Sequence, residues 1–233
     1  MEVIGHRGAA ALAPENTLES FELALSLGVD AIETDVHSTS DGELVLIHDK
    51  NLSRTTNGGG LVYETPWSVV RDLDAGSSFS VEHAGARIPL LRDVLERYGQ
   101  RTHIVLEIKQ PDLELRVLAM VREMGLLNAV TFSSFYFSIV QNLKAQAPDA
   151  KVGSLTIDAK PETTQRVLEA KLDQICPPAP FLSPELVTNW KASGLEVRAW
   201  GIKDTDLMQS AIEAGVDGMT VDFPHLLLKA LGR

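Results

Sequence analysis

An almost unbroken alternation of strand-like and helix-like segments constrains the fold of this 233-residue chain more than any other feature. Short runs of apolar, often β-branched residues predict strands, and longer runs with apolar residues three or four positions apart predict helices. The predicted barrel strands lie near residues 3–5, 31–36, 103–109, 130–134, 151–156, 172–176, 196–202 and 218–221. Each is followed by a helical pattern, near 18–27, 90–98, 113–124, 137–147, 161–170, 184–192, 205–214 and 224–231.

Eight strand–helix units in a chain of this length predict an α/β fold, a (β/α)₈ or TIM barrel. The main alternative is a doubly wound open sheet, which would normally carry a glycine-rich phosphate-binding turn after its first strand. Gly8-Ala9-Ala10-Ala11 is a poor version of such a turn. The barrel is therefore the favoured interpretation.

One segment, from about residue 50 to 89, interrupts the alternation after the second barrel strand. Residues 44–47 just before it predict an extra strand that returns beside the second. The segment contains glycine and proline turns but also apolar side chains such as Trp67 and Phe79, too many for a solvated linker. We expect a single domain, 1–233, with a small inserted subdomain that packs over the C-terminal rim and narrows access to it.

Composition restricts the classes of partner. The formal net charge of −11 argues against general affinity for nucleic acid or an anionic membrane. No apolar run reaches the ~18 residues of a membrane span, and the first residues lack the features of a signal peptide. We expect a cytoplasmic protein with a small-molecule substrate, without nucleic acid and without stable membrane insertion, and we leave a homodimer open. Cys176 is the only cysteine, so no internal disulfide forms.

Acidic residues stand at the ends of the second and third barrel strands. Glu33 and Asp35 are two positions apart and share one face of their strand, and Glu107 follows on the next strand. In a parallel barrel these ends meet at the rim where the chemistry takes place. Three carboxylates suit one hard divalent cation, Mg²⁺, Ca²⁺ or Mn²⁺. The alternative is a buried ionic layer with Arg7 and Lys109 and no metal.

Two histidines, His6 and His48, also follow apolar runs. Either alone would more often be a structural histidine, but together, beside acids and cations, they fit paired proton transfer near neutral pH. Arg7 and Lys109 are candidate phosphate contacts, because arginine offers a planar fork and lysine a point charge. Trp200 ends the seventh strand, either as a wall for the organic part of a substrate or as a packing residue of the rim.

These residues also carry a resemblance that covers nearly the whole chain in the right order. The chain resembles the cytoplasmic bacterial type of glycerophosphodiester phosphodiesterase. The matching stretches are His6-Arg7-Gly8, Pro14-Glu15-Asn16-Thr17, Glu33-Thr34-Asp35-Val36, Thr39-Ser40-Asp41-Gly42, Val45-Leu46-Ile47-His48-Asp49, Arg54-Thr55-Thr56-Asn57-Gly58, Ile88-Pro89-Leu90-Leu91, Glu107-Ile108-Lys109, Ser133-Ser134-Phe135 and Gly215-Val216-Asp217-Gly218.

The resemblance implies a (β/α)₈ barrel with an inserted subdomain, and it implies roles for particular residues. The implied site has metal ligands Glu33, Asp35 and Glu107, catalytic histidines His6 and His48, and substrate or phosphate contacts at Arg7, Lys109, Glu15, Asn16 and Trp200.

The implied reaction is metal-dependent hydrolysis of glycerophosphodiesters, such as glycerophosphocholine or glycerophosphoethanolamine, to sn-glycerol 3-phosphate and an alcohol. Members are thought to use the glycerol 2-hydroxyl of the substrate as nucleophile and to pass through a cyclic phosphate. Such a route fits the lack of an obvious serine or cysteine nucleophile here. We assign His6 as the base and His48 as the acid.

Two departures from the family pattern lie on the late strands. Gly201-Ile202-Lys203 follows Trp200 where the family usually has Thr-Val-Asn, and Val221 replaces a threonine. Both departures affect the part of the pocket that receives the organic group of the substrate, and so they concern head-group preference rather than the reaction. Three alternatives stay open: a lysophospholipase D-type enzyme acting on lipids, a non-catalytic barrel that binds ligands, and an enolase-type isomerase, which would need a base such as a lysine pair.

Overall fold

The computed structural model describes residues 1–233 and contains a closed barrel of parallel strands, which confirms the predicted fold. The order around the ring is β1, β2, β4, β5, β6, β7, β8 and β9, and β9 pairs with β1 to close it. The strands are β1 (Glu2–His6), β2 (Ala31–Ser38), β4 (His103–Ile108), β5 (Val130–Ser134), β6 (Lys151–Leu155), β7 (Gln174–Cys176), β8 (Glu196–Ala199) and β9 (Gly218–Val221).

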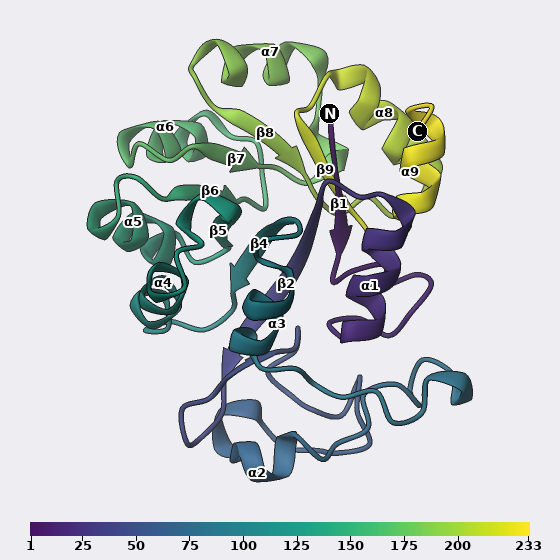
Figure 1. Ribbon diagram of the computed structural model, residues 1–233. Helices are drawn as coiled ribbons and strands as arrows, with labels where there is room; N and C mark the ends of the chain where they lie inside the picture. Colours follow the sequence, from purple (N-terminus) through teal and green to yellow (C-terminus); the bar gives the residue numbers. More distant parts are fainter.

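Helices surround the barrel on its outside (Figure 1). They are α1 (Leu18–Leu27), α3 (Leu91–Tyr98), α4 (Glu114–Glu123), α5 (Phe137–Gln146), α6 (Pro161–Glu169), α7 (Pro184–Ala192), α8 (Thr205–Ala214) and α9 (Pro224–Ala230). None of the helices has both the length and the apolar character needed to cross a bilayer.

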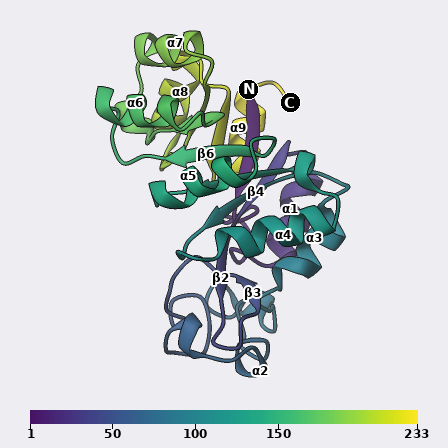
Figure 2. The ribbon, with the colours of Figure 1, turned by 90° about the vertical axis from the view of Figure 1, so that its left-hand side faces the viewer.

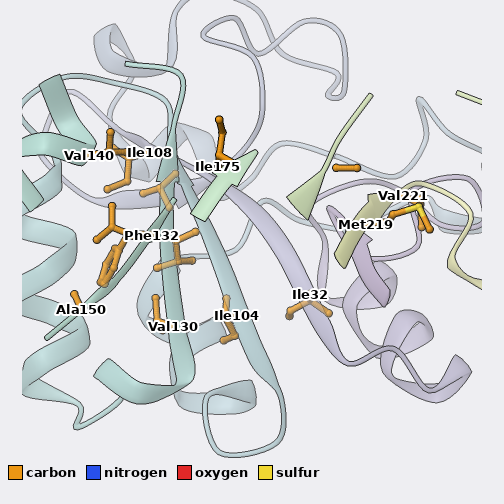
Figure 3. Packing of buried hydrophobic residues seen from close by; sticks show 14 of the residues in the cluster. Ile32, Ile104, Ile108, Val130, Phe132, Val140, Ala150, Ile175, Met219 and Val221 are labelled. Carbon is orange, nitrogen blue, oxygen red and sulfur yellow. The ribbon is translucent and has the colours of Figure 1, made fainter. Parts of the chain in front are cut away.

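The main hydrophobic core lies between the strands and these helices. It contains 46 buried residues, and Figure 3 shows part of it, with Ile104, Val130 and Phe132 pointing from their strands towards the helix layer. Inside the barrel, only Ile4, Ala31 and Val105 form a small apolar cluster. Because successive strand residues face opposite sides, the remaining inward positions are free to carry polar groups. This arrangement leaves room for charged chemistry at one end of the barrel.

The segment after the second barrel strand forms a separate layer. Strand β3 (Leu44–Leu46) runs antiparallel to β2, and the chain then passes through the short helices η1 (Val62–Glu64), α2 (Trp67–Val70) and η2 (Val81–His83). Figures 1 and 2 show this blue segment beyond the carboxyl end of β2. It has its own small core, consisting of Val45, Ile47, Leu52, Val62, Val70, Ala75 and Ile88.

The loop after β1 presses closely against α1. Gly8 adopts a φ of 91°, and a Cβ atom there would lie 2.3 Å from the Ser20 hydroxyl oxygen. That hydroxyl donates to the Arg7 carbonyl and accepts from the Ala9 backbone N–H, both at 2.9 Å. Only glycine fits this close approach without strain. The contact fixes the direction in which the chain leaves β1, and so it positions His6 and Arg7.

Candidate active site

A cavity of about 340 Å³ opens where the carboxyl ends of the barrel strands meet. The early strands contribute His6, Arg7, Glu33, His48 and Glu107 to its lining, and the later strands contribute Phe135, Leu155, Arg198, Trp200, Gly201, Ile202, Lys203, Thr220 and Asp222. The cavity therefore joins residues that are far apart in the sequence but share one rim of the barrel.

Three buried carboxylates gather at the base of this rim. Glu33, Asp35 and Glu107 each offer an oxygen atom, and these oxygens all lie within 4.8 Å of one another. The strand register explains their proximity, since Asp35 on β2 pairs directly with Glu107 on β4, and Glu33 shares the face of Asp35. Lys109 lies 2.7 Å from Glu107 and 3.5 Å from Asp35.

Asp35 is the most strongly compensated of the three. Burial opposes its ionisation, but the charges of Arg7 and Lys109 lower the pKa of Asp35 to about 2. The Arg7 Nε atom lies 3.1 Å from its Oδ2 oxygen, and the Asn16 side-chain amide donates to the same oxygen at 2.9 Å. The Oδ1 oxygen accepts no hydrogen bond although it is buried. Asp35 is thus anionic, and its Oδ1 oxygen has only the Lys109 ammonium group, 3.5 Å away, beside it.

Glu33 has no close cationic side chain. Its Oε2 oxygen accepts from the Arg7 backbone N–H at 3.1 Å, and the His6 Nε2 atom lies 3.9 Å away. Burial, reinforced by the nearby charge of Asp35, raises the pKa of Glu33 to about 7. Burial likewise raises the pKa of Glu107.

The protein thus supplies two cations to three clustered acids. The ionic layer considered from the sequence does exist, since Arg7 and Lys109 both contact Asp35. Neither cation forms an ion pair with Glu33, whose nearest basic side chain is His6 at 3.9 Å. A buried, oxygen-only donor set with this shortage of positive charge fits a hard divalent cation. Glu33, Asp35 and Glu107 are the residues that would hold it.

The two histidines are each held by a carboxylate. The His6 Nδ1 atom lies 2.5 Å from Asp222 Oδ1, and the His48 Nδ1 atom lies 2.6 Å from Asp49 Oδ1. A carboxylate at Nδ1 favours the tautomer with the proton there. It thereby leaves Nε2 of each ring available to exchange a proton with a ligand in the cavity.

The surroundings of the two rings differ. Burial lowers the pKa of His6, but the hydrogen bond with Asp222 and the charge of Glu33 outweigh it, so the pKa is raised overall. Burial lowers the pKa of His48, and the positive charges of Arg7 and Lys109 add to that effect. His6 therefore holds its proton more tightly than His48 does.

Two residues predicted as substrate contacts lie outside the cavity lining. Glu15 pairs with Arg7 and Arg54, each at 2.8 Å. Asn16 is buried, donates to Asp35 and accepts from the Thr34 hydroxyl at 2.7 Å. Both contacts hold other groups of the site in place. We therefore interpret Glu15 and Asn16 as positioning residues.

The other predicted contacts also have defined places. Lys109 contacts the acids but is not part of the cavity wall, whereas Arg7 and Trp200 are. The Trp200 indole donates to the Cys176 carbonyl at 3.0 Å and packs edge-on against Phe135. Trp200 is thus both a packing residue of the rim and a wall of the cavity, which combines the two interpretations left open by the sequence.

The inserted segment borders the site on one side. Its Arg54 lies 2.7 Å from Asp49, the partner of His48, and also binds Glu15. No residue between 50 and 89 lines the cavity. The segment therefore braces His48 from outside the cavity, and the expected narrowing of the entrance stays a prediction.

Sequence reasoning missed several groups on the late strands. Asp222 has no role among the residues predicted from the sequence, although its place directly after the last strand puts it on the same rim as His6. Arg198 and Thr220 are likewise absent from the predicted site, yet both are buried and line the cavity. Strand alternation could have found Arg198, because its neighbours Val197 and Ala199 are apolar and face the helices.

A closed (β/α)₈ barrel with clustered acids and paired histidines at its C-terminal rim defines a barrel enzyme that acts on a small ligand. The model of the glycerophosphoryl diester phosphodiesterase family matches residues 6–226. The chain therefore belongs to the glycerophosphoryl diester phosphodiesterase family, and it is an enzyme of the phosphoric diester hydrolase class.

Relatives and solved structures agree with this assignment. The glycerophosphodiester phosphodiesterase of Caldanaerobacter subterraneus subsp. tengcongensis is 36% identical over 232 residues, covering 97% of this chain and 96% of the relative. The crystal structure of the Agrobacterium tumefaciens enzyme is 30% identical with a TM-score of 0.88, covering 98% of this chain and 99% of that one.

A third similarity comes from a phosphodiesterase with bound product. The structure of an Oleispira antarctica phosphodiesterase in complex with the product sn-glycerol-3-phosphate is 32% identical, with a TM-score of 0.89. The match covers 100% of this chain and 97% of that chain.

Proposed function

We propose that this enzyme hydrolyses glycerophosphodiesters, such as glycerophosphocholine and glycerophosphoethanolamine, to sn-glycerol 3-phosphate and an alcohol. The observation that carries the proposal is one cavity lined by two carboxylate-held histidines, by Arg7 and by two of the three clustered acids, Glu33 and Glu107, with the third, Asp35, within 4.8 Å of them. The product bound to the Oleispira antarctica relative supports the choice of substrate. The reaction places the enzyme in glycerol and lipid metabolism.

One divalent cation, Mg²⁺, Ca²⁺ or Mn²⁺, belongs to the proposal, with Glu33, Asp35 and Glu107 as its ligands. When bound, such an ion stabilises negative charge on phosphoryl oxygens. Arg7 lines the cavity and Lys109 stands beside the acids, so both can add positive charge near the phosphate.

Proton transfer falls to the two histidines. Cleavage through a cyclic phosphate needs one group to take the proton of the glycerol 2-hydroxyl and another to protonate the leaving alkoxide. In-line displacement places these two oxygens on opposite sides of phosphorus, and two rings on separate strands can flank them. We propose His48 as the base and His6 as the acid, the reverse of the order assigned from the sequence, because Asp222 and Glu33 stabilise the imidazolium of His6.

Lipid substrates are a second candidate, favoured by exposed apolar side chains beside the cavity. Tyr136, Ile157 and Phe181 follow β5, β6 and β7 and are between 50% and 74% exposed. An apolar rim of this kind is what a lysophospholipase D-type enzyme would need to receive an acyl chain. Comparing turnover of lysophosphatidylcholine and glycerophosphocholine separates the two candidates.

The experiment that tests the main proposal is a substrate panel assayed with EDTA and with single cations restored. We expect release of sn-glycerol 3-phosphate from glycerophosphocholine, its loss in EDTA, and its recovery with Mg²⁺, Ca²⁺ or Mn²⁺. Full turnover in a verified metal-free sample would remove the cation from the mechanism. Absence of turnover on every diester, with each cation present, would remove the activity itself. The cytoplasmic location and the homodimer stay predictions.

A further inference from the structure

A buried arginine inside the barrel has no role in the mechanism above. Arg198 lies on β8 between Val197 and Ala199, which both belong to the outer hydrophobic core. Its side chain therefore points into the barrel, where it lines the cavity and is only 3% exposed.

The guanidinium of Arg198 is poorly satisfied by the protein. One nitrogen donates to the Thr220 hydroxyl at 2.9 Å, and the Nε and Nη2 atoms have no partner. No carboxylate forms an ion pair with it. A buried charge without a counter-ion is costly, so such groups usually have a partner or receive one on binding.

The charged residues around Arg198 indicate that its missing partner is an anionic group of a ligand. Arg7 and Lys109 already serve the acid cluster and the expected phosphate position. Asp222, which directly follows the neighbouring strand β9, is committed to His6. Lys203, after β8, lines the same part of the cavity and also forms no ion pair. Arg198 is thus a buried cation on the late-strand side of the cavity that pairs with none of the acids of the site.

We propose that Arg198, supported by Thr220, binds a second anionic group on the substrate, a carboxylate or phosphate carried by the alcohol of the diester. The inference rests on the proposed function, which it narrows to glycerophosphodiesters with a negatively charged alcohol. Arginine suits this task because its planar fork can bind two oxygens of such a group.

The test uses two substrates that differ by a single carboxylate, glycerophosphoserine and glycerophosphoethanolamine. With the divalent cation supplied, we expect the wild-type enzyme to have the higher kcat/KM on glycerophosphoserine. Arg198→Met should lower that preference ~10- to 100-fold, mainly through a higher KM for glycerophosphoserine. A loss of this size corresponds to one charge-assisted hydrogen bond. Turnover of glycerophosphoethanolamine should change little. Lys203→Met is the matched control, because it removes an exposed charge from the same wall and should change the preference far less.

Two results would overturn the inference. One is a wild-type enzyme without preference for glycerophosphoserine. The other is an equal loss on both substrates in Arg198→Met, which would make Arg198 a general or structural residue.

A binding measurement keeps the inference testable if Arg198→Met fails to fold or if the wild type cleaves neither diester. Phosphoserine and phosphoethanolamine are monoesters with the same carboxylate difference. Phosphoserine should raise the Tm of the wild-type protein more, because at equal concentration the ligand with the lower Kd stabilises the folded state more. Equal shifts would contradict the subsite. Absence of cleavage together with unequal shifts would contradict only the proposed function.

Discussion

At the scale of single residues, the site is a balance of charges that the protein leaves incomplete. Asp35 is matched by Arg7, Lys109 and the amide of Asn16, so it ionises readily. Glu33 lies only two residues away, but its side chain meets just a backbone N–H at close range. Because Glu33 lacks the compensation that Asp35 has, the site without a metal lowers the stability of the folded protein.

Replacing Glu33 tests that statement through stability rather than activity. The pKa of Glu33 in the folded state, about 7, exceeds its ordinary value of 4.5. The folded state therefore holds the proton more tightly, and stability falls as pH rises between those values. In EDTA at pH 8, Glu33→Gln should therefore unfold at a higher urea concentration than the wild type. Its free energy of unfolding should be larger by ~1–3 kcal/mol. With Mg²⁺ or Ca²⁺ in large excess the order should reverse, since only the wild type gains the full binding energy.

Urea titrations in both conditions check this reversal. The fall in wild-type stability between pH 4.5 and about 7 should be smaller in the variant, where Glu107 is the remaining acid with a raised pKa. A variant that is less stable than the wild type in EDTA would show that Glu33 is compensated in a way the contacts do not explain.

The histidine pair gives a second prediction at this scale. His6→Ala and His48→Ala should each lower kcat on glycerophosphocholine by ~10²- to 10⁴-fold, the usual contribution of a positioned acid or base. A p-nitrophenyl ester of glycerol phosphate hardly needs an acid, because its leaving group is already stable as an anion. That substrate should restore most of the turnover of His6→Ala but not of His48→Ala.

Steady-state kinetics of both variants on both substrates check the assignment. Rescue of His48→Ala instead would restore the order first assigned from the sequence. Near wild-type turnover in either variant would end the two-histidine mechanism.

At the scale of elements, the strands and helices were predictable because each carries its own pattern. Strand β4 reads as a run of β-branched and aliphatic residues, and helices such as α8 begin at an N-cap, Asp204, and end at a glycine, Gly215. The site was predictable only in part. The position of a residue at the end of a predicted strand shows that it lies on the C-terminal rim. The pairing of His6 with Asp222, 216 positions apart, depends on closure of the barrel and is not visible in the sequence.

The remaining misses have a similar cause. Asn16 adopts a φ of 57° in the loop before α1, so its side chain turns to Asp35 rather than capping the helix, which Thr17 does. A local pattern cannot reveal such a contact, because Asn16 and Thr17 are both good N-cap residues.

The packing of α1 against β1 leads to a prediction with a built-in control. Gly8 and Gly28 both have a φ of 91°, but a Cβ atom at Gly8 would collide with Ser20 while one at Gly28 would meet nothing within 4 Å. Gly28→Ala should cost about 1 kcal/mol, from backbone strain alone. Gly8→Ala should cost about 3 kcal/mol or more and should also lower kcat, because it displaces the loop that holds His6.

Urea unfolding and turnover of the two variants check this prediction. Equal losses of stability would mean that the loop yields easily and that the contact with Ser20 does not position the site.

At the scale of the whole molecule, the chain has two cores of unequal size. The barrel core contains 46 buried residues, whereas the core of the segment after β2 contains 7. The small core still matters to the site, since Arg54 within that segment binds the carboxylate that holds His48. Few buried apolar contacts usually mean a low free energy of local opening. The brace of His48 is therefore expected to open before the barrel does.

Hydrogen exchange can separate the two cores with one substitution made in each. Val62 and Val130 are both fully buried, the first in the small core and the second in the barrel core. Each change to alanine should cost about 2 kcal/mol where it acts. Val62→Ala should speed exchange of amides within the segment, such as that of Leu52, which donates to the Gly60 carbonyl, and leave the barrel amides unchanged. Val130→Ala should speed exchange of the slowest amides throughout the barrel. If Val62→Ala speeds both sets equally, the segment and the barrel unfold as one unit, and His48 is held as firmly as the barrel itself.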